Sequence, residues 1–143
     1  MWYEMKIFFT YKLKGSLDND NKYIKLTEHL KKYGTILSEN IRLKNVGVSG
    51  QKLSDDQILK RNIDLIKESD VLIADVTNAS LGVGYQIHFA KTINKKIICL
   101  YNRQVKCELS SIINGDKNLI IINYDDIDDV IIKIDNIICN LKI

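Results

Sequence analysis

Hydrophobic positions along the chain gather in five short runs, and stretches with helical spacing separate them. Most of the runs are continuous in Ile, Val and Leu rather than alternating with polar residues. That pattern is typical of strands buried on both faces of a parallel sheet. It predicts strands at residues 6–10, 35–37, 71–76, 96–101 and 119–124.

The segments between the runs predict helices. Tyr23, Leu26, Leu30 and Tyr33 recur at helical spacing, and Gly34 marks an end. A capping-box pattern at residues 54–57 predicts a helix from there to about residue 68, and further helices are expected at residues 84–94, 109–114 and 126–141. Alternating strands and helices indicate one α/β domain over residues 1–143, a flavodoxin- or Rossmann-like three-layer sandwich with a five-stranded, mainly parallel sheet.

Composition narrows the possible functions. The net charge of +3 is too small, and too evenly spread, for a nucleic-acid-binding protein, and no apolar run is long enough to span a membrane. Cys99, Cys107 and Cys139 match neither a zinc site nor a redox pair, so a reducing, cytoplasmic location is expected, with Cys99 in the core. His29 and His88 are isolated, and we expect neither a metal nor another cofactor.

Ligands of such sheets bind outside the carboxyl ends of the strands. After the third strand, Ser80, Gly82 and Gly84 form a loop that lets backbone amides and a hydroxyl approach an anion, although glycines also serve ordinary tight turns. After the first strand, Lys12 and Lys14 flank a turn that presents ammonium groups to a phosphate or is simply solvated.

Two further positions have two interpretations each, and a third has one. Asn62 lies in the middle of a predicted helix, where Asn has poor propensity, and is either a solvent-facing residue or a functional one. Ser110 is a helix cap, which we favour, or a ligand donor. Asp75 is expected to orient the loop after the third strand by hydrogen bonds.

Several segments together resemble one enzyme family. They are residues 6–10, 34–39, 69–77 and 80–85, and residues 100–101 and 109–115 continue the match in the same order. They resemble the 2'-deoxynucleoside 5'-phosphate N-hydrolases, which belong with the nucleoside 2-deoxyribosyltransferases, and Ser-Leu-Gly-Val-Gly-Tyr at 80–85 is highly specific. The resemblance implies a flavodoxin-like sheet, a homodimer whose sites share residues between subunits, and cleavage of the bond between base and deoxyribose.

The resemblance also shows where this chain departs from the family. The nucleophilic Glu of the family aligns with Gln86, and its neighbouring catalytic Asp aligns with Asn62. The family's Gly-Ser-Ile-Arg-Gly phosphate loop appears at residues 11–15 with two lysines, and a His becomes Asn40. Ser110 is retained and is expected to reach the phosphate in the neighbouring subunit. The residues implied to contact the ligand are Phe8, Lys12, Leu13, Lys14, Gly15, Asn40, Ser80, Gly82, Gly84 and Ser110.

An amide is not a nucleophile at neutral pH, and loss of two acids removes repulsion from a ligand phosphate. The pattern therefore favours a catalytically silent protein that binds or sequesters a nucleotide or nucleotide signal. One alternative is an active N-glycosidase of 2'-deoxynucleoside 5'-monophosphates, or a deoxyribosyl transferase, that uses Asp64, Asp75 or Glu39. Another is a partner-binding domain with a vestigial pocket. The two amides are either natural or engineered to trap a substrate; the changes at Lys12 and Asn40 favour natural divergence.

Overall fold

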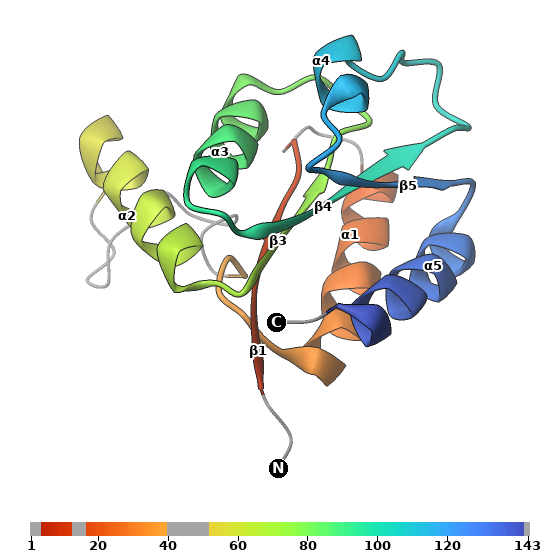
Figure 1. The fold of residues 1–143 in the computed structure, drawn as a ribbon, viewed down its shortest axis with the longest axis horizontal. Helices are drawn as coiled ribbons and strands as arrows, with labels where there is room; N and C mark the ends of the chain where they lie inside the picture. The colour runs from red at the N-terminus through yellow and green to blue at the C-terminus, as the bar shows by residue number, and fades with distance from the viewer. Residues whose placement is uncertain (1–3, 13–16, 40–51, 142–143) are drawn as a thin grey trace.

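The strands form one parallel sheet with helices on both faces (Figure 1). The computed structural model describes residues 4–12, 17–39 and 52–141. The strands are β1 (Met5–Thr10), β2 (Gly34–Ile36), β3 (Val71–Asp75), β4 (Lys96–Asn102) and β5 (Ile120–Tyr124), in the order β2-β1-β3-β4-β5. All four strand pairs are parallel. The predicted α/β sandwich is confirmed.

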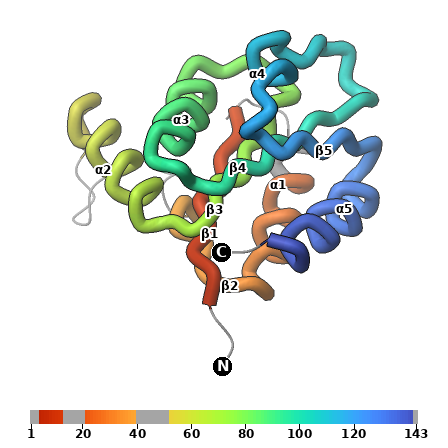
Figure 2. The backbone as a smooth tube through the Cα atoms, viewed as in Figure 1, coloured from red at the N-terminus to blue at the C-terminus, as the bar shows by residue number. Residues whose placement is uncertain are grey.

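The helices divide between the two faces of the sheet. They are α1 (Leu17–Leu30), α2 (Asp55–Glu68), α3 (Leu81–Thr92), α4 (Ser111–Gly115) and α5 (Ile127–Asn140), and a 3₁₀ turn, η1 (Lys31–Tyr33), continues α1. Helices α1 and α5 cover one face, and α2 and α3 lie on the other (Figure 2). No helix in the described part of the chain is long and apolar enough to cross a bilayer.

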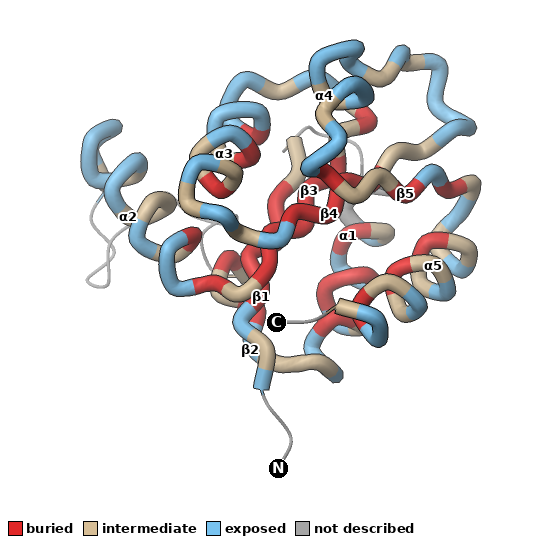
Figure 3. Tube along the Cα trace, in the orientation of Figure 1, coloured by how far each residue is buried: buried red, intermediate tan, exposed pale blue. Residues whose placement is uncertain are grey.

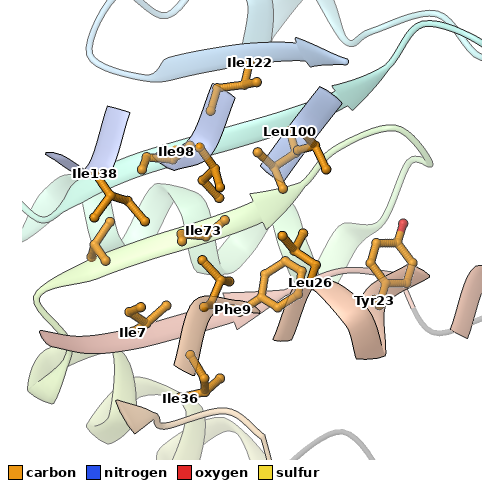
Figure 4. Packing of buried hydrophobic residues seen from close by; sticks show 14 of the residues in the cluster. Ile7, Phe9, Tyr23, Leu26, Ile36, Ile73, Ile98, Leu100, Ile122 and Ile138 are labelled. Atoms are coloured by element: carbon orange, nitrogen blue, oxygen red, sulfur yellow. The ribbon is translucent and has the colours of Figure 1, made fainter. Parts of the chain in front are cut away.

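Successive strand residues point into opposite layers, which explains the continuous apolar runs. Ile7 and Phe9 of β1 pack under α1 and α5, whereas Phe8 between them packs under α2 and α3. Figure 4 shows the first of these clusters, and Figure 3 shows the buried strands running through the centre of the molecule. Cys99 of β4 is fully enclosed, and burial raises the pKa of its thiol to about 12, so its predicted core role is confirmed.

Two local signals for helix ends are confirmed, one before α2 and one after η1. The side chain of Gln57 accepts a hydrogen bond from the Ser54 backbone N–H at 2.9 Å, closing the capping box before α2. Gly34 follows η1 with φ of 154°, and a Cβ there would lie 1.9 Å from the Met5 carbonyl oxygen. Only glycine fits this approach between the end of the first helical segment and β1.

Candidate functional site

The sheet has its switch point between β1 and β3. These neighbours pair in parallel, with Thr10 opposite Ala74. The chain leaves β1 through α1 toward β2 on one side, and leaves β3 through α3 toward β4 on the other. The crevice at the carboxyl ends of β1 and β3 is therefore where a ligand of this fold is expected.

A chain of hydrogen bonds crosses this end of the sheet and links three elements. Thr10, the last residue of β1, donates its hydroxyl proton to Gln86 Oε1 at 2.7 Å. Gln86 Nε2 of α3 donates to Asn62 Oδ1 of α2 at 2.9 Å, and Asn62 Nδ2 donates to the Ile58 carbonyl at 2.8 Å. The structure thus brings together the two residues that the resemblance aligned with the family's carboxylates.

The direction of this chain is fixed from its far end. The Ile58 carbonyl can only accept, so Asn62 turns its nitrogen toward it and its oxygen toward Gln86. Gln86 then has to present its own nitrogen, which leaves its oxygen for the Thr10 hydroxyl. The pair is neutral and fully ordered without sharing a proton, which two carboxylates at this distance would have to do.

The helix that carries Gln86 begins earlier than the sequence predicted. Helix α3 starts at Leu81, not at residue 84, with Ser80 as its N-cap accepting from the Val83 backbone N–H at 3.4 Å. Gly82 and Gly84 therefore lie in the first turn of the helix instead of in a loop. Among the described residues, a Cβ at either glycine would meet nothing within 4 Å. Nothing in that part of the chain demands these glycines, and none of it covers the surface beside them.

Two cavities border this turn of α3. One, of about 460 Å³, lies between α2 and α3 and is lined by Asn62, Gly82 and Gln86. The other, of about 560 Å³, lies between α3 and α4 and is lined by Ser80, Gly84 and Ser110. Leu81 lines both cavities and is 97% exposed.

Ser110 differs from the interpretation that we favoured. It occupies the N-cap position of α4, but its hydroxyl makes no cap hydrogen bond. The hydroxyl is therefore not used to cap α4, and Ser110 lines the cavity between α3 and α4. Lys91 and Asp116 form an ion pair of 2.6 Å at the same cavity, and the hydrogen bond from Lys91 lowers the pKa of Asp116.

The structure describes only two of the other predicted ligand residues, Phe8 and Lys12. Phe8 is 1% exposed and packs in the core under α2 and α3, and its predicted contact with the ligand stays a prediction. Lys12 lies just beyond β1 and is half-buried. The remaining predictions, Leu13, Lys14, Gly15 and Asn40, lie outside the described residues.

The three acids considered as replacement nucleophiles are engaged elsewhere. Asp64 pairs with Lys60 on the exposed side of α2, and Glu39 pairs with Lys31. Asp75 is 2% exposed; it accepts from the Thr77 backbone N–H at 2.9 Å, as predicted for a residue that orients the loop.

Asp75 also belongs to a small buried cluster on the α1 side of the sheet. Its carboxylate accepts from the Tyr124 hydroxyl at 2.7 Å, and Lys22 donates to that hydroxyl at 2.8 Å. Burial raises the pKa of Tyr124 and lowers that of Lys22. These groups hold the ends of β3 and β5 together, and none of them bonds to Gln86.

Sequence reasoning missed Thr10 as part of the site. Its only sequence signal was its position at the carboxyl end of β1, next to the loop that we did consider. It also missed Asp55, the one carboxylate among the described residues lining the cavity between α2 and α3. Asp55 is the first residue of α2 and precedes Asn62 by seven residues, which corresponds to about 10 Å along the helix.

Comparisons with known proteins find one matching family. Residues 7–130 match the family described as nucleoside 2-deoxyribosyltransferase. The chain is 33% identical over 116 residues to the 5-hydroxymethyl-dUMP N-hydrolase of Tetraodon nigroviridis, which covers 80% of this chain and 82% of that protein. It is also 33% identical over 112 residues to the protein of the same name from Danio rerio, with 78% of each chain covered.

Solved structures match the fold across nearly the whole chain. The CMP N-glycosidase BcmB of Clostridium botulinum superimposes with a TM-score of 0.63 at 23% identity, covering 91% of this chain and 98% of that one. The solution structure of BlsM gives a TM-score of 0.69 at 18% identity, covering 94% and 90%. At these identities the likeness supports the fold and not a shared substrate.

Proposed function

Because the chain belongs to the nucleoside 2-deoxyribosyltransferase family, we propose that it binds a nucleotide at the carboxyl edge of its sheet and leaves the glycosidic bond intact. The family includes deoxynucleotide N-hydrolases, so the pocket has the ancestry of a nucleotide site. The observation that carries the proposal is the hydrogen bond of 2.9 Å between Gln86 and Asn62. Covalent glycosidase chemistry needs a charged oxygen at the anomeric carbon, and the Gln86 amide supplies none.

The open surface of α3 supports a ligand at this place. Gly82 and Gly84 carry no side chain where the described residues leave room for one. The amino end of α3 also favours an anion through its backbone N–H groups and the helix dipole. A nucleotide phosphate near Ser80 would use that end, as the resemblance implies.

An assay that follows the ligand and its base tests the proposal. Calorimetry with the 5'-monophosphates of ribo- and deoxyribonucleosides is expected to show binding. Chromatography of the mixture should then return the nucleotide whole. Absence of binding across the panel, or release of free base at an enzymatic rate, would overturn the proposal.

Restoring both acids is a sharper test of the residue assignment. The double substitution Asn62→Asp with Gln86→Glu is expected to create or raise release of free base, since it returns a carboxylate to the family's position. Lys60→Gln with Asp64→Asn, on the exposed side of α2, is the matched control and should release none. Full binding without any gain in release by the first double variant would contradict the assignment of Gln86.

The second candidate is an active N-glycosidase, which the names of the relatives favour. The acid it would use is Asp55, because Asp55 lines the same cavity as Gln86. If the purified chain releases base, Asp55→Asn should abolish that release and Asp56→Asn, next to it in the first turn, should not. Equal effects of the two substitutions would remove Asp55 from the role.

We also propose that two copies of the chain form a homodimer through the side that carries both cavities. Leu59, Leu81, Tyr85 and Ile112 are apolar and exposed by 46%, 97%, 59% and 85%. Three of them line the cavity between α2 and α3, and Leu81 and Ile112 line the other cavity, so they form one continuous surface. Leu81→Asp is expected to yield a monomer by light scattering, whereas Ile132→Asp on α5 should not; a wild-type chain that is already monomeric would contradict the dimer.

A further inference from the structure

The amide pair leaves hydrogen-bonding capacity that points to one class of sugar. Each amide nitrogen carries two hydrogens, and within the described part of the chain Gln86 Nε2 uses one of them on Asn62. Thr10 donates its single hydroxyl proton to Gln86, and among the described residues no group donates to its oxygen, so both lone pairs remain available. Gln86 therefore offers a donor, and Thr10 offers an acceptor, side by side at the end of β1.

The place of Gln86 relative to a bound sugar follows from the proposed function, on which this inference rests. A residue aligned with the attacking group lies beneath the anomeric carbon, on the ring face opposite the base. In ribose the 2'-hydroxyl projects from that same face, one carbon away. A 2'-deoxyribose presents only a methylene there.

From these contacts we propose that the site is selective for a ribonucleotide, with the 2'-hydroxyl accepting from Gln86 Nε2 and donating to Thr10 Oγ1. A hydroxyl is both a donor and an acceptor, so it satisfies the two spare groups together. In a catalytic site, the carboxylate oxygen at this position would form a bond to the sugar. The Gln86 amide cannot form that bond, so it needs a hydrogen-bonding partner instead.

The selectivity follows from the cost of leaving these groups without a partner. Thr10 is 8% exposed and Gln86 is half-buried, so a bound deoxyribose would shut water away from an N–H and a hydroxyl oxygen that it cannot satisfy. Sites that bond to a ligand hydroxyl reject the analogue that lacks it much more strongly than apolar pockets reject a missing methylene.

Three sugars on one base separate this inference from the proposed function. The affinities of CMP, dCMP and arabino-CMP, and of the matching AMP set, are measured by calorimetry on the wild-type chain. Ribose is expected to bind at least tenfold more tightly than deoxyribose. Arabinose, whose 2'-hydroxyl lies on the other face, should be as weak as deoxyribose. Equal or tighter binding of either weak sugar overturns the inference alone, whereas no binding of any sugar removes the proposed function with it.

Substitutions identify the groups that discriminate. Gln86→Leu and Thr10→Val should each reduce the preference for ribose over deoxyribose to less than threefold. Asn140→Leu is the control for Gln86→Leu, because it also replaces a side-chain amide by leucine, at an exposed position on α5. It should keep the full preference. A preference that survives both substitutions, with folding confirmed by circular dichroism, overturns the assignment.

Discussion

At the scale of single residues, the Gln86 amide is held by one partner on each side, and each partner determines which atom it meets. Thr10 donates to the oxygen and Asn62 accepts from the nitrogen. Asn62 cannot turn over without placing its oxygen against the Ile58 carbonyl. The two native amides therefore satisfy each other's hydrogen bonds. Replacing only one of them by the family's carboxylate breaks this arrangement.

The substitution Gln86→Glu alone is therefore expected to destabilise the fold. It places an oxygen without a hydrogen against Asn62 Oδ1, and such unsatisfied contacts cost about 1–3 kcal/mol. Urea unfolding at pH 8 should show the loss, and at pH 4 it should shrink because a protonated carboxyl can donate. Gln57→Glu, at the exposed capping box, is the control: its Oε1 still accepts from Ser54, so stability should change by less than about 0.5 kcal/mol. Equal losses in both variants would contradict the argument.

At the scale of elements, sequence pattern located the strands well because most of them are continuous apolar runs with a layer of helices on either side. It located the start of α3 poorly, since Gly82 and Gly84 have low helix propensity and suggested a loop. Both lie in a helical turn because the Ser80 cap and the buried face of Val83 and Ile87 outweigh that propensity. The pairing of Asn62 with Gln86 was beyond any local pattern, because 24 residues separate them and only the packing of α2 against α3 brings them together.

The substitution Gly82→Ala tests whether this glycine lowers the stability of α3 and leaves the surface beside it open for binding. Alanine in a helix is favoured over glycine by about 1 kcal/mol, and its Cβ would meet nothing within 4 Å. The free chain should therefore gain about 0.5–1 kcal/mol in urea unfolding while its nucleotide affinity or dimerisation falls. Gly34→Ala should instead be strongly destabilising, because its Cβ would overlap the Met5 carbonyl. A Gly82→Ala chain with unchanged binding and unchanged oligomeric state would argue against a ligand or partner at this turn.

At the scale of the whole molecule, the two faces of the sheet differ in what completes them. Helices α1 and α5 close one face with a large apolar cluster (Figure 4), and a polar cluster joins their ends. On α5, Asp135 accepts from His29 of α1 and from Lys32 and Tyr33 of η1. The opposite face keeps its apolar residues exposed around two cavities. Stability is therefore concentrated on the first face, and binding is expected on the second.

The Asp135 cluster predicts that the stability contributed by the first face depends on pH. Burial opposes the charged carboxylate, but the hydrogen bonds from Tyr33, His29 and Lys32 outweigh it and hold the pKa of Asp135 below its ordinary value. A carboxyl with a lowered pKa in the folded state contributes stability that is complete above its unfolded pKa, about 4, and is lost as the pH falls through the lower folded value.

Asp135→Asn should cost about 1–2 kcal/mol of unfolding free energy at pH 7, and this loss of stability should narrow steadily below pH 4. Asp64→Asn, which removes an exposed pair with Lys60, should change stability little. A deficit that stays constant from pH 7 to pH 3 would mean that Asp135 stabilises through packing alone. Unchanged nucleotide affinity in the Asp135 variant would agree with a binding site confined to the opposite face.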